Sequence, residues 1–445
     1  MTDIPRHPKV TVLGSGYLGA AHASCLAKMG FSVLGVDTDA IRIDTLSRGS
    51  LPFFEPGLEP LLRDGLESGL LRFTTSYPEA AAFGDVHFVC VGTPQRAGAD
   101  CADLSQVEAC ISALAPLLES PCLVVGKSTV PAGTASVLTR ELKRLSPARD
   151  AVELAWNPEF LREGHAVEDT LCPDRIVAGV ASRRAEALLR QVYAQQIGTG
   201  TSFFVTDLAT AELAKVAANS FLATKISFIN AMAEVCDVAG GDVVLLSQIL
   251  GADRRIGPSF LAPGLGFGGA CLPKDIRAFR ARAIEMGVGE ALSFLREVDA
   301  INLRCRDRIV NLVQELADGS ITGRAVGVLG AAFKADSDDV RDSPSLAVAK
   351  TVHDLGARVT VYDPEATNKA RQLYPELEYA DSAMDAACDA DVLLLLTEWP
   401  EFRDADPEIL GKTVARRNIV DGRNVLDPDL WRSAGWNFRA LGRPS

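Results

Sequence analysis

The stretch "VTVLGSGYLG", residues 10–19, begins with a short apolar run over 10–13, which stops at three glycines spaced G-x-G-x-x-G. A helical pattern follows over 20–29, and a second apolar run over 32–36 ends at Asp37. Strand, glycine turn, helix and strand in this order form a βαβ unit. The glycine spacing alone is weakly specific, but here an acidic residue also falls 21 positions beyond Gly16, as in a dinucleotide-binding fingerprint. We therefore predict a Rossmann-type dinucleotide site at this turn.

Each residue of this fingerprint has a physical role. Gly14 permits the tight turn, Gly16 lets the backbone approach a pyrophosphate, and Gly19 lets the helix pack on the strand. The helix N-terminus then faces the phosphates. Asp37 would accept hydrogen bonds from the adenosine ribose and repel a 2′-phosphate, which favours NAD, although Arg42 nearby keeps some use of NADP open. The alternative for Asp37 is a simple turn residue at the end of a strand.

The composition excludes several classes of protein. With 445 residues, 47% hydrophobic and 23% charged, the chain is typical of a globular protein of two or three domains. The first residues, MTDIPRHP, lack the apolar core of a signal peptide, and no apolar run approaches the roughly 20 residues of a membrane helix. A net charge of −13 without a long basic run argues against nucleic acid as a partner.

The cysteines and histidines indicate neither disulfides nor metal. Ten cysteines are scattered without a C-x-x-C pair, so we expect reduced thiols in a cytoplasmic protein, with no disulfide framework and no zinc site. Five histidines are scattered too, and none lies in a metal or catalytic pattern.

Further strand-like runs over 86–91 and 122–126 each end in small or polar residues, where an open α/β sheet binds its ligands. The stretch "AWNPEFLREG" (155–164) continues the pattern, and its Asn-Pro pair predicts a helix start. That helix would place Glu159 and Glu163 on one face. An acidic first turn that only favours the helix dipole is the alternative.

The middle of the chain is helical in pattern. From 206 to 250 glycine and proline almost vanish until Gly240, and the apolar spacing is that of a helix. Lys215 and Asn219 are four residues apart and therefore neighbours on one helical face. A lysine on a helix is usually a solvated charge, which is the alternative here.

The stretch "GFGGACLPKD", residues 266–275, sets three glycines ahead of Cys271 and follows it with Lys274 and Asp275. One interpretation is a turn with a buried cysteine beside it. The other is a nucleophile that a bulky substrate must reach. These ten residues alone leave both open.

The last segment repeats the opening pattern. A strand-like run over 324–334 reaches a glycine turn, a helical pattern covers 345–355, and a strand-like run over 357–364 contains Asp363 near its end. We predict a second doubly wound unit without a full G-x-G-x-x-G, which follows a linker near 317–323.

Nine stretches in this order resemble the UDP-glucose/GDP-mannose dehydrogenase family over nearly the whole chain: "GSGYLG", "GTP" (92–94), "KSTVPAGT" (127–134), "NPEFLREG" (157–164), "LAKVAANSFLATKISFIN" (213–230), "GADRRIGPSFL" (251–261), "GFGGACLPKD", "GAAFKADSDDVRDSP" (330–344) and "DGRN" (421–424). The resemblance implies an α/β fold with two Rossmann-like doubly wound domains joined by a central helical domain. The expected domains are an NAD-binding domain over 1–200, a helical dimer core with the cysteine loop over 201–316, and a sugar-nucleotide-binding domain over 320–445.

The family oxidises the 6-hydroxymethyl group of a sugar nucleotide to a carboxylate, with two NAD molecules used in one site. The resemblance implies that Cys271 traps the intermediate aldehyde as a thiohemiacetal, which is oxidised to a thioester and hydrolysed by water. The thiolate is the reactive form of a cysteine. Gly266, Gly268 and Gly269 would leave room for the hexose and offer backbone N–H groups.

Other catalytic roles are implied in the same way. Lys215 and Asn219 resemble the residues that stabilise oxyanions, and Asp275 resembles one that orders a water or takes part in proton transfer. Glu159 is similar to the carboxylate that activates the hydrolytic water, with Thr129 beside it. Lys215, Asp275 and Glu159 all stay open as the base of each step.

The implied cofactor contacts are Gly14, Gly16, Tyr17, Leu18, Gly19, Asp37, Arg42, Thr93, Thr129, Glu163, Lys274 and Arg341. The implied contacts to the sugar nucleotide are Glu159, Phe160, Leu161, Lys215, Asn219, Phe260, Leu261, Gly268, Lys274, Lys334 and Arg423, with Arg255 from a neighbouring subunit. Cations there suit a pyrophosphate in an acidic protein, although each alone is typical of a solvated surface. Ala270 stands where many members carry serine.

The stretches "GADRRIGPSFL" and "GFGGACLPKD" resemble the UDP-glucose branch of the family more than its other branches. The resemblance therefore implies UDP-glucose as the substrate, and TDP-glucose and GDP-mannose stay open. A two-electron β-hydroxyacid dehydrogenase would share the first domain and the lysine–asparagine face, and a nucleotide-binding scaffold would keep the fold without turnover. We expect a homodimer or higher homo-oligomer through the helix around 210–240, the alternative being that this helix packs only within its own chain.

Overall fold

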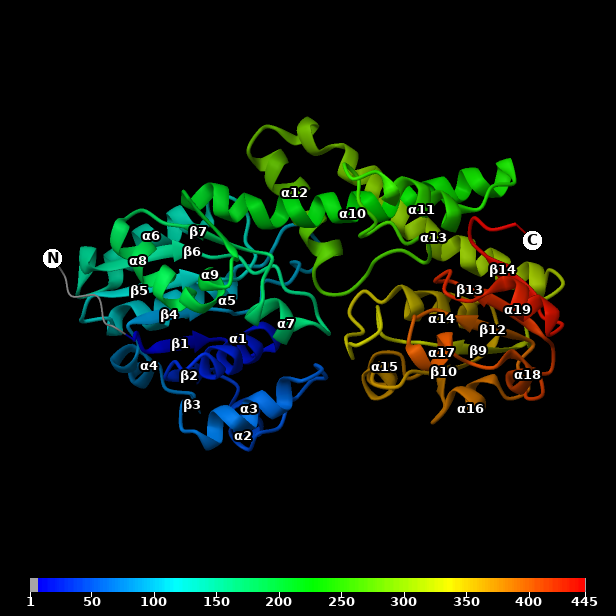
Figure 1. The fold of residues 1–445 in the computed structure, drawn as a ribbon, viewed down its shortest axis with the longest axis horizontal. Helices are drawn as coiled ribbons and strands as arrows, with labels where there is room; N and C mark the ends of the chain where they lie inside the picture. The colour runs from blue at the N-terminus through cyan, green and yellow to red at the C-terminus, as the bar shows by residue number, and fades with distance from the viewer. Residues whose placement is uncertain (1–6, 445) are drawn as a thin grey trace. The chain divides into compact units, whose positions relative to one another are not determined.

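The computed structural model describes residues 7–444 (Figure 1). The described chain forms two compact units that divide between Ala218 and Asn219, and each is described by itself. Residues 1–6, part of the segment in which we expected no signal peptide, lie outside the described residues. Within 7–444, no helix has the length and apolar character needed to cross a membrane.

The first unit is built on an eight-stranded sheet in the order β3-β2-β1-β4-β5-β6-β7-β8, parallel except between β6 and β7. Its first six positions have the order of a doubly wound Rossmann sheet. In register, Val10 lies opposite Val33 on one side and Val86 on the other. The strands are β1 (Val10–Leu13), β2 (Val33–Val36), β3 (Leu71–Thr74), β4 (Val86–Val89), β5 (Cys122–Gly126), β6 (Val152–Trp156), β7 (Arg175–Gly179) and β8 (Ser202–Thr206).

Helices cover both faces of this sheet because successive strand residues point to opposite sides. Val12 of β1 belongs to an apolar cluster with residues of α1, α3 and α8, and Leu13 belongs to one with residues of α5 and α6; all of β1 is buried. The helices are α1 (Tyr17–Lys28), α2 (Ala40–Ser47), α3 (Leu58–Glu67), α4 (Tyr77–Phe83), α5 (Ser105–Leu114), α6 (Thr134–Leu145), α7 (Ala166–Leu171), α8 (Arg183–Val192), α9 (Ala194–Gly198) and α10 (Leu208–Ala239), with 3₁₀ turns η1 (Ala115–Leu117) and η2 (Arg149–Ala151). The long helix α10 starts in this unit and ends in the next.

The second unit contains a six-stranded, fully parallel sheet in the order β11-β10-β9-β12-β13-β14, the doubly wound order again. Its strands are β9 (Ala325–Leu329), β10 (Arg358–Tyr362), β11 (Glu378–Tyr379), β12 (Val392–Leu395), β13 (Asn418–Asp421) and β14 (Asn437–Ala440). Its helices are α11 (Val243–Ala252), α12 (Leu272–Glu285), α13 (Phe294–Leu316), α14 (Pro344–Asp354), α15 (Thr367–Leu373), α16 (Ala383–Ala387), α17 (Pro400–Arg403), α18 (Pro407–Leu410) and α19 (Pro428–Ser433), with a 3₁₀ turn η3 (Gly289–Leu292). Two doubly wound sheets with helices α10–α13 between them in the chain confirm the predicted fold class.

The helix predicted to start at Asn157 is wrong. Residues 157–165 form a loop with a turn at 163–164, and α7 begins only at Ala166. The Glu159 carboxylate accepts the N–H of Leu161 at 2.7 Å, and Gly164 has a φ of 81°. Side chains thus take N–H groups that a first helical turn would have used, and Glu159 and Glu163 share no helical face.

Candidate active site

The three glycines of the opening turn differ in what surrounds them. Gly14 has a φ of 90°, and a Cβ there would lie 2.8 Å from the backbone nitrogen of Val91. At Gly19 a Cβ would collide with the carbonyl of Gly14, so the first turn of α1 packs directly on the glycine turn. At Gly16, by contrast, a Cβ would meet no atom of the described residues within 4 Å. The N-cap of α1 is this Gly16, followed by Tyr17 and Leu18, and it offers open space at a helix N-terminus.

Asp37, at the end of β2, is held firmly at the same turn. One of its carboxylate oxygens accepts the N–H of Ser15 at 2.8 Å and an Arg42 N–H at 2.9 Å. The other accepts the N–H of Asp39 at 3.0 Å. The side chain is 9% exposed. Glycine turn, open helix N-terminus and fixed carboxylate together fit the pyrophosphate and ribose of a dinucleotide.

Glu159 and Lys215 form a buried ion pair in the first unit. The Lys215 ammonium lies 2.9 Å from a Glu159 carboxylate oxygen, and their side chains are 5% and 10% exposed. The ammonium also lies 5.6 Å from the centre of the Phe160 ring, and the Arg175 guanidinium lies 3.9 Å from that centre. Lys215 is therefore not a solvated helix charge.

The loops after β4 and β5 are tied together by a hydrogen bond. The Thr93 hydroxyl, in the loop after β4, donates to the Thr129 carbonyl at 2.8 Å. Sequence reasoning missed a third group here, Lys127, although the motif "KSTVPAGT" contains it. Its ammonium donates to the Asn157 side-chain oxygen at 3.2 Å, and burial lowers its pKa. Lys127 thus anchors the start of the loop that carries Glu159.

Glu55 was missed as well, and it organises the turn that carries Glu163. Its carboxylate accepts the N–H groups of Gly164 and Ala166, each at 2.7 Å, and the hydroxyl of Tyr17. It is 4% exposed. Its position between α2 and α3, more than 100 residues from the turn, carries no local signal of this role.

Glu212 ties the helix that carries Lys215, α10, to the start of α6. Its carboxylate accepts the N–H of Gly133 at 2.7 Å and of Ala135 at 2.6 Å, at the start of α6. A carboxylate at a helix N-terminus is a favourable charge–dipole arrangement. Because Glu212 precedes Lys215 by three residues on α10, it fixes that helix against the loop that holds Thr129.

In the second unit Cys271 is exposed and forms the N-cap of α12. Its carbonyl accepts the N–H of Asp275 at 3.0 Å. The interpretation of a buried cysteine beside a turn is therefore wrong. Burial raises the pKa of other thiols in the chain, to about 12 for Cys25, Cys90, Cys110 and Cys122 and about 11 for Cys305.

One helical turn beyond Cys271, the Asp275 carboxylate joins two predicted site residues. It accepts the Asn219 amide N–H at 2.7 Å and lies 2.6 Å from the Lys274 ammonium. Asp275 and Asn219 are 2% and 6% exposed. On α10, Lys215 and Asn219 are thus one turn apart, and each is fixed by a different carboxylate.

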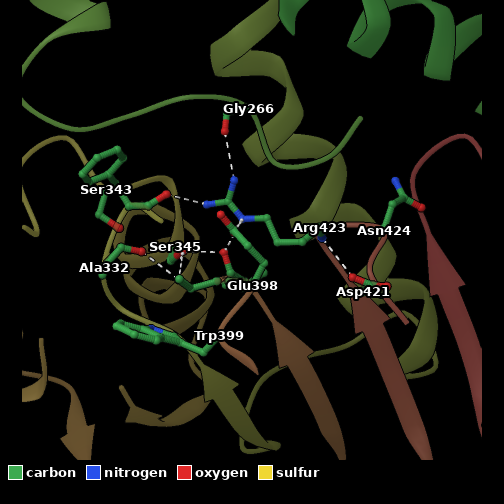
Figure 2. A network of polar contacts seen from close by, with 12 residues as sticks. Gly266, Ala332, Ser343, Ser345, Glu398, Trp399, Asp421, Arg423 and Asn424 are labelled. Atoms are coloured by element: carbon green, nitrogen blue, oxygen red, sulfur yellow. Dashed lines mark hydrogen bonds and ion pairs between the residues drawn. The ribbon is translucent and has the colours of Figure 1, made fainter. Parts of the chain in front are cut away.

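Arg423, in the loop after β13, points its guanidinium at backbone carbonyls (Figure 2). It donates to Gly266 at 3.1 Å, to Phe333 at 2.8 Å and to Leu396 at 2.7 Å. The Glu398 carboxylate lies 3.1 Å from its Nε, and the side chain is 12% exposed. Arg423 is therefore embedded in the unit rather than solvated at its surface.

The remaining predicted residues of the second unit lie between α11 and α12 and between β9 and α14. The Lys334 ammonium lies 5.9 Å from the Phe333 ring centre. Arg341 pairs with Asp339 at 2.7 Å, and its carbonyl accepts the N–H of Gly269 at 3.0 Å. Phe260 has a φ of 63°, and Leu261 is buried. A Cβ at Gly268 would lie 2.6 Å from the Pro344 ring. The Arg255 side chain is 89% exposed and pairs with Asp253 at 2.6 Å.

Three models of the UDP-glucose/GDP-mannose dehydrogenase family match the chain: its NAD binding domain over 8–197, its central domain over 209–304 and its UDP binding domain over 327–428. The chain is 41% identical to UDP-glucose 6-dehydrogenase of Rhizobium meliloti, with 98% of this chain and 100% of that protein covered. It is 40% identical to UDP-glucose 6-dehydrogenase of Pseudomonas aeruginosa, with 98% of each covered.

Solved structures of similar proteins superpose on nearly the whole chain. A UDP-glucose dehydrogenase from Pyrobaculum islandicum superposes with a TM-score of 0.90 at 36% identity, covering 99% of this chain and 100% of that one. A UDP-D-ManNAc dehydrogenase from Pyrococcus horikoshii superposes with a TM-score of 0.86 at 28% identity, covering 98% and 99%. The chain therefore belongs to the UDP-glucose/GDP-mannose dehydrogenase family and is an NAD-dependent oxidoreductase.

Proposed function

We propose that the chain oxidises the 6-hydroxymethyl group of UDP-glucose to a carboxylate and reduces two NAD⁺ per sugar. The observation that carries the proposal is the exposed Cys271 at the N-terminus of α12, beside the Asp275–Asn219 pair. It occurs in a chain whose relatives at 41% and 40% identity are named UDP-glucose 6-dehydrogenase. A helix N-terminus favours the thiolate form of a cysteine.

In the first oxidation, the C6 hydroxyl loses its proton to a base of the chain while C6 loses a hydride, which leaves an aldehyde. NAD⁺, when bound, accepts the hydride in each of the two oxidations. Lys215 and Asn219 stabilise the negative charge on the sugar oxygen, as fixed donors do in oxyanion holes. Lys215, Asp275 and Glu159 are the three candidates for the base.

In the second oxidation, the Cys271 thiolate adds to the aldehyde carbon and forms a C–S bond. The oxyanion takes up a proton and becomes a thiohemiacetal hydroxyl. Loss of that proton and of a second hydride from C6 gives a thioester on Cys271. Water then adds to the thioester carbonyl, and Glu159 takes the proton of that water, with Thr129 beside it. The C–S bond breaks, which returns the Cys271 thiolate, and the carboxylic acid product loses its proton and leaves as the carboxylate.

The NAD contacts we propose are those of the glycine turn, Asp37, Arg42, Thr93, Thr129, Glu163, Lys274 and Arg341. The sugar-nucleotide contacts we propose are Phe160, Leu161, Phe260, Leu261, Gly268, Lys334 and Arg423. The domain boundaries 1–200, 201–316 and 320–445 are retained as part of the proposal, supported by the three family-model spans. We also assign the chain to the cytoplasm, because its ten scattered cysteines, without a C-x-x-C pair, suit a reducing compartment.

A homo-oligomer belongs to the proposal. Phe221, Phe228 and Val235 of α10 are spaced by seven residues and are 67%, 49% and 56% exposed. Leu245 and Ile249 of α11 are 56% and 62% exposed. A row of large exposed apolar side chains on a helix is typical of a surface that a second copy covers. The strongly exposed Arg255 suits a residue that reaches into a neighbouring subunit.

UDP-glucose is proposed ahead of TDP-glucose and GDP-mannose because the relatives of highest identity reported above carry its name. A thymine methyl group is worth only about 1 kcal/mol, so use of TDP-glucose as a second substrate is compatible with the proposal. A scaffold without turnover would have no need for the buried Glu159–Lys215 pair, which costs desolvation to maintain.

The variant Cys271→Ser tests the covalent route. We expect its formation of UDP-glucuronate to fall at least a hundredfold, while binding of UDP-glucose changes less than threefold. Cys172→Ser is the matched control, because Cys172 is also exposed, and it should keep the wild-type rate. A Cys271→Ser enzyme that makes the carboxylate at the wild-type rate would overturn the proposed route.

A further inference from the structure

The loop that leads to Cys271 has neither helix nor strand over 264–269, yet its backbone groups are held one after another. The N–H of Gly264 donates to the Asn230 side chain at 2.9 Å. The N–H of Leu265 donates to the Gly422 carbonyl at 2.7 Å, and that of Gly269 to the Arg341 carbonyl at 3.0 Å. External groups therefore replace the secondary structure that the loop lacks.

Asn302, on α13, holds the same loop with two hydrogen bonds. Its side-chain oxygen accepts the N–H of Phe267 at 2.7 Å, and its side-chain nitrogen donates to the carbonyl of the same residue at 3.0 Å. Asn302 is 1% exposed. Because both polar groups of one amide engage both polar groups of one peptide residue, the contact fixes the orientation of that residue as well as its position.

Gly266 is the residue that lets this amide approach. It has a φ of 91°, a region that favours glycine. A Cβ at Gly266 would collide with the Asn302 side-chain oxygen. The glycine that we first associated with room for a hexose therefore also makes room for the Asn302 amide.

Arg423 holds the loop through the adjacent carbonyl. It donates to Gly266 at 3.1 Å, and its other nitrogens are anchored on the carbonyls of Phe333 and Leu396 (Figure 2). The backbone at 266–267 is thus clamped between α13 and the loop after β13. Cys271 follows Phe267 by four residues, so the clamp lies just ahead of the thiol in the chain.

We propose that Asn302 is a positioning residue for Cys271. It holds Phe267 so that the thiol stays at the N-terminus of α12, where a helix favours the thiolate. The inference rests on the proposed role of Cys271 as the nucleophile. A reacting atom displaced by about 1 Å can cost about a hundredfold in rate, so a clamp remote from the substrate can control the rate without binding it.

The test uses the full chain with Asn302→Ala, which removes both hydrogen bonds, and Asn302→Gln, which keeps a donor and an acceptor but sets them one methylene farther from the backbone. Iodoacetamide is the probe, and peptide mass spectrometry measures the alkylation rate of Cys271 relative to that of Cys388. Cys388 is exposed and lies in the same unit, so it reports on reagent and pH. The second measurement is kcat and KM for UDP-glucose.

Asn418→Ala is the matched control. The Asn418 amide donates to the carbonyls of Asp391 at 3.0 Å and Leu316 at 3.4 Å, in the same unit but on the sheet. Its loss should lower thermal stability without changing kcat or the alkylation ratio.

For Asn302→Ala we expect the Cys271/Cys388 ratio to fall at least fivefold and kcat to fall ten- to hundredfold, with KM within about threefold of wild type. Asn302→Gln should show a smaller fall in both, and it tests the proposal even if Asn302→Ala does not fold. A lower melting temperature with unchanged ratio and kcat would reduce Asn302 to a structural role and overturn the inference. If wild-type Cys271 reacts no faster than Cys388, the proposed role of Cys271 itself fails, so the two failures are distinguishable.

Discussion

The Glu159 carboxylate lies 2.9 Å from the Lys215 ammonium, and the two side chains are 10% and 5% exposed. Two buried opposite charges stabilise one another, because both have lost most of their contact with water. The pair therefore has a role in stability that can be separated from its proposed role in catalysis.

Removal of one partner should cost more stability than removal of both. Lys215→Met leaves a buried carboxylate without its cation, and we expect the free energy of unfolding to fall by about 3 kcal/mol. Glu159→Gln combined with Lys215→Met should recover at least half of that loss, while activity stays lost in all three variants. Urea unfolding of the two single variants and the double variant measures the coupling. Additive losses would show that the pair contributes no mutual stabilisation.

Asp37 and Arg42 should control the choice of cofactor together. Asp37→Asn removes the charge that repels a 2′-phosphate and releases Arg42 from its 2.9 Å ion pair. We expect the ratio of kcat/KM for NADP to that for NAD to rise at least tenfold. Adding Arg42→Ala should reverse most of that gain, because the guanidinium is then no longer present to bind the phosphate. Steady-state kinetics with both cofactors measures this ratio. An unchanged ratio in Asp37→Asn would contradict the assignment of Asp37 as the residue that selects NAD.

Two buried histidines should make the first unit sensitive to acid. Burial lowers the pKa of His87 to about 4 and that of His22 well below 6.5. Between pH 6.5 and 4 the unfolded chain therefore binds protons that the folded chain does not, and stability falls as the pH falls. For His87 the loss amounts to about 3 kcal/mol over that window, with little change above pH 7.

His87→Asn isolates this term, since an asparagine oxygen can replace the ring nitrogen that contacts the Thr11 hydroxyl at 2.6 Å. We expect the pH dependence of urea unfolding between pH 6.5 and 4 to become shallower by up to about 1.4 kcal/mol per pH unit. Equal slopes for the variant and the wild type would show that His87 is not held neutral by burial.

The apolar row on α10 should hold two copies together. Phe228→Asp places a charge in that row, and we expect it to shift the protein to monomers in sedimentation velocity. Ile409→Asp is the matched control, because Ile409 of α18 is 52% exposed, close to the 49% of Phe228, and lies outside the row. If both variants sediment like the wild type, the row is not the interface.

The sequence predicted most reliably what depends on neighbouring residues. The strands over 10–13 and 122–126 have the predicted bounds, because a short apolar run that ends in glycine or polar residues determines them locally. The helix predicted from Asn157 was wrong because Glu159 and Glu55 take the N–H groups it would have needed. An Asn-Pro pair is compatible with a helix start, but it carries no information about a carboxylate that a residue far away in the sequence supplies.

The residues that sequence reasoning missed act over long separations. Glu212 binds N–H groups 77 and 79 residues away, and Glu55 binds groups 109 and 111 residues away. Asn302 binds Phe267 across 35 residues. No periodicity or spacing encodes such contacts, since they exist only after the chain has folded. The proposed catalytic residues all lie in the quoted motifs. Glu55 and Asn302, which hold the segments that carry Glu163 and Cys271, do not.

The central claim is a four-electron oxidation of UDP-glucose, and counting NADH tests it most directly. Limiting UDP-glucose is added to the enzyme with excess NAD⁺, with TDP-glucose and GDP-mannose in parallel, and the NADH formed is divided by the sugar consumed. The account predicts two NADH per UDP-glucose, with an acidic product. One NADH per sugar would contradict it in favour of a single two-electron oxidation, and none with any sugar nucleotide would contradict an oxidoreductase acting on them.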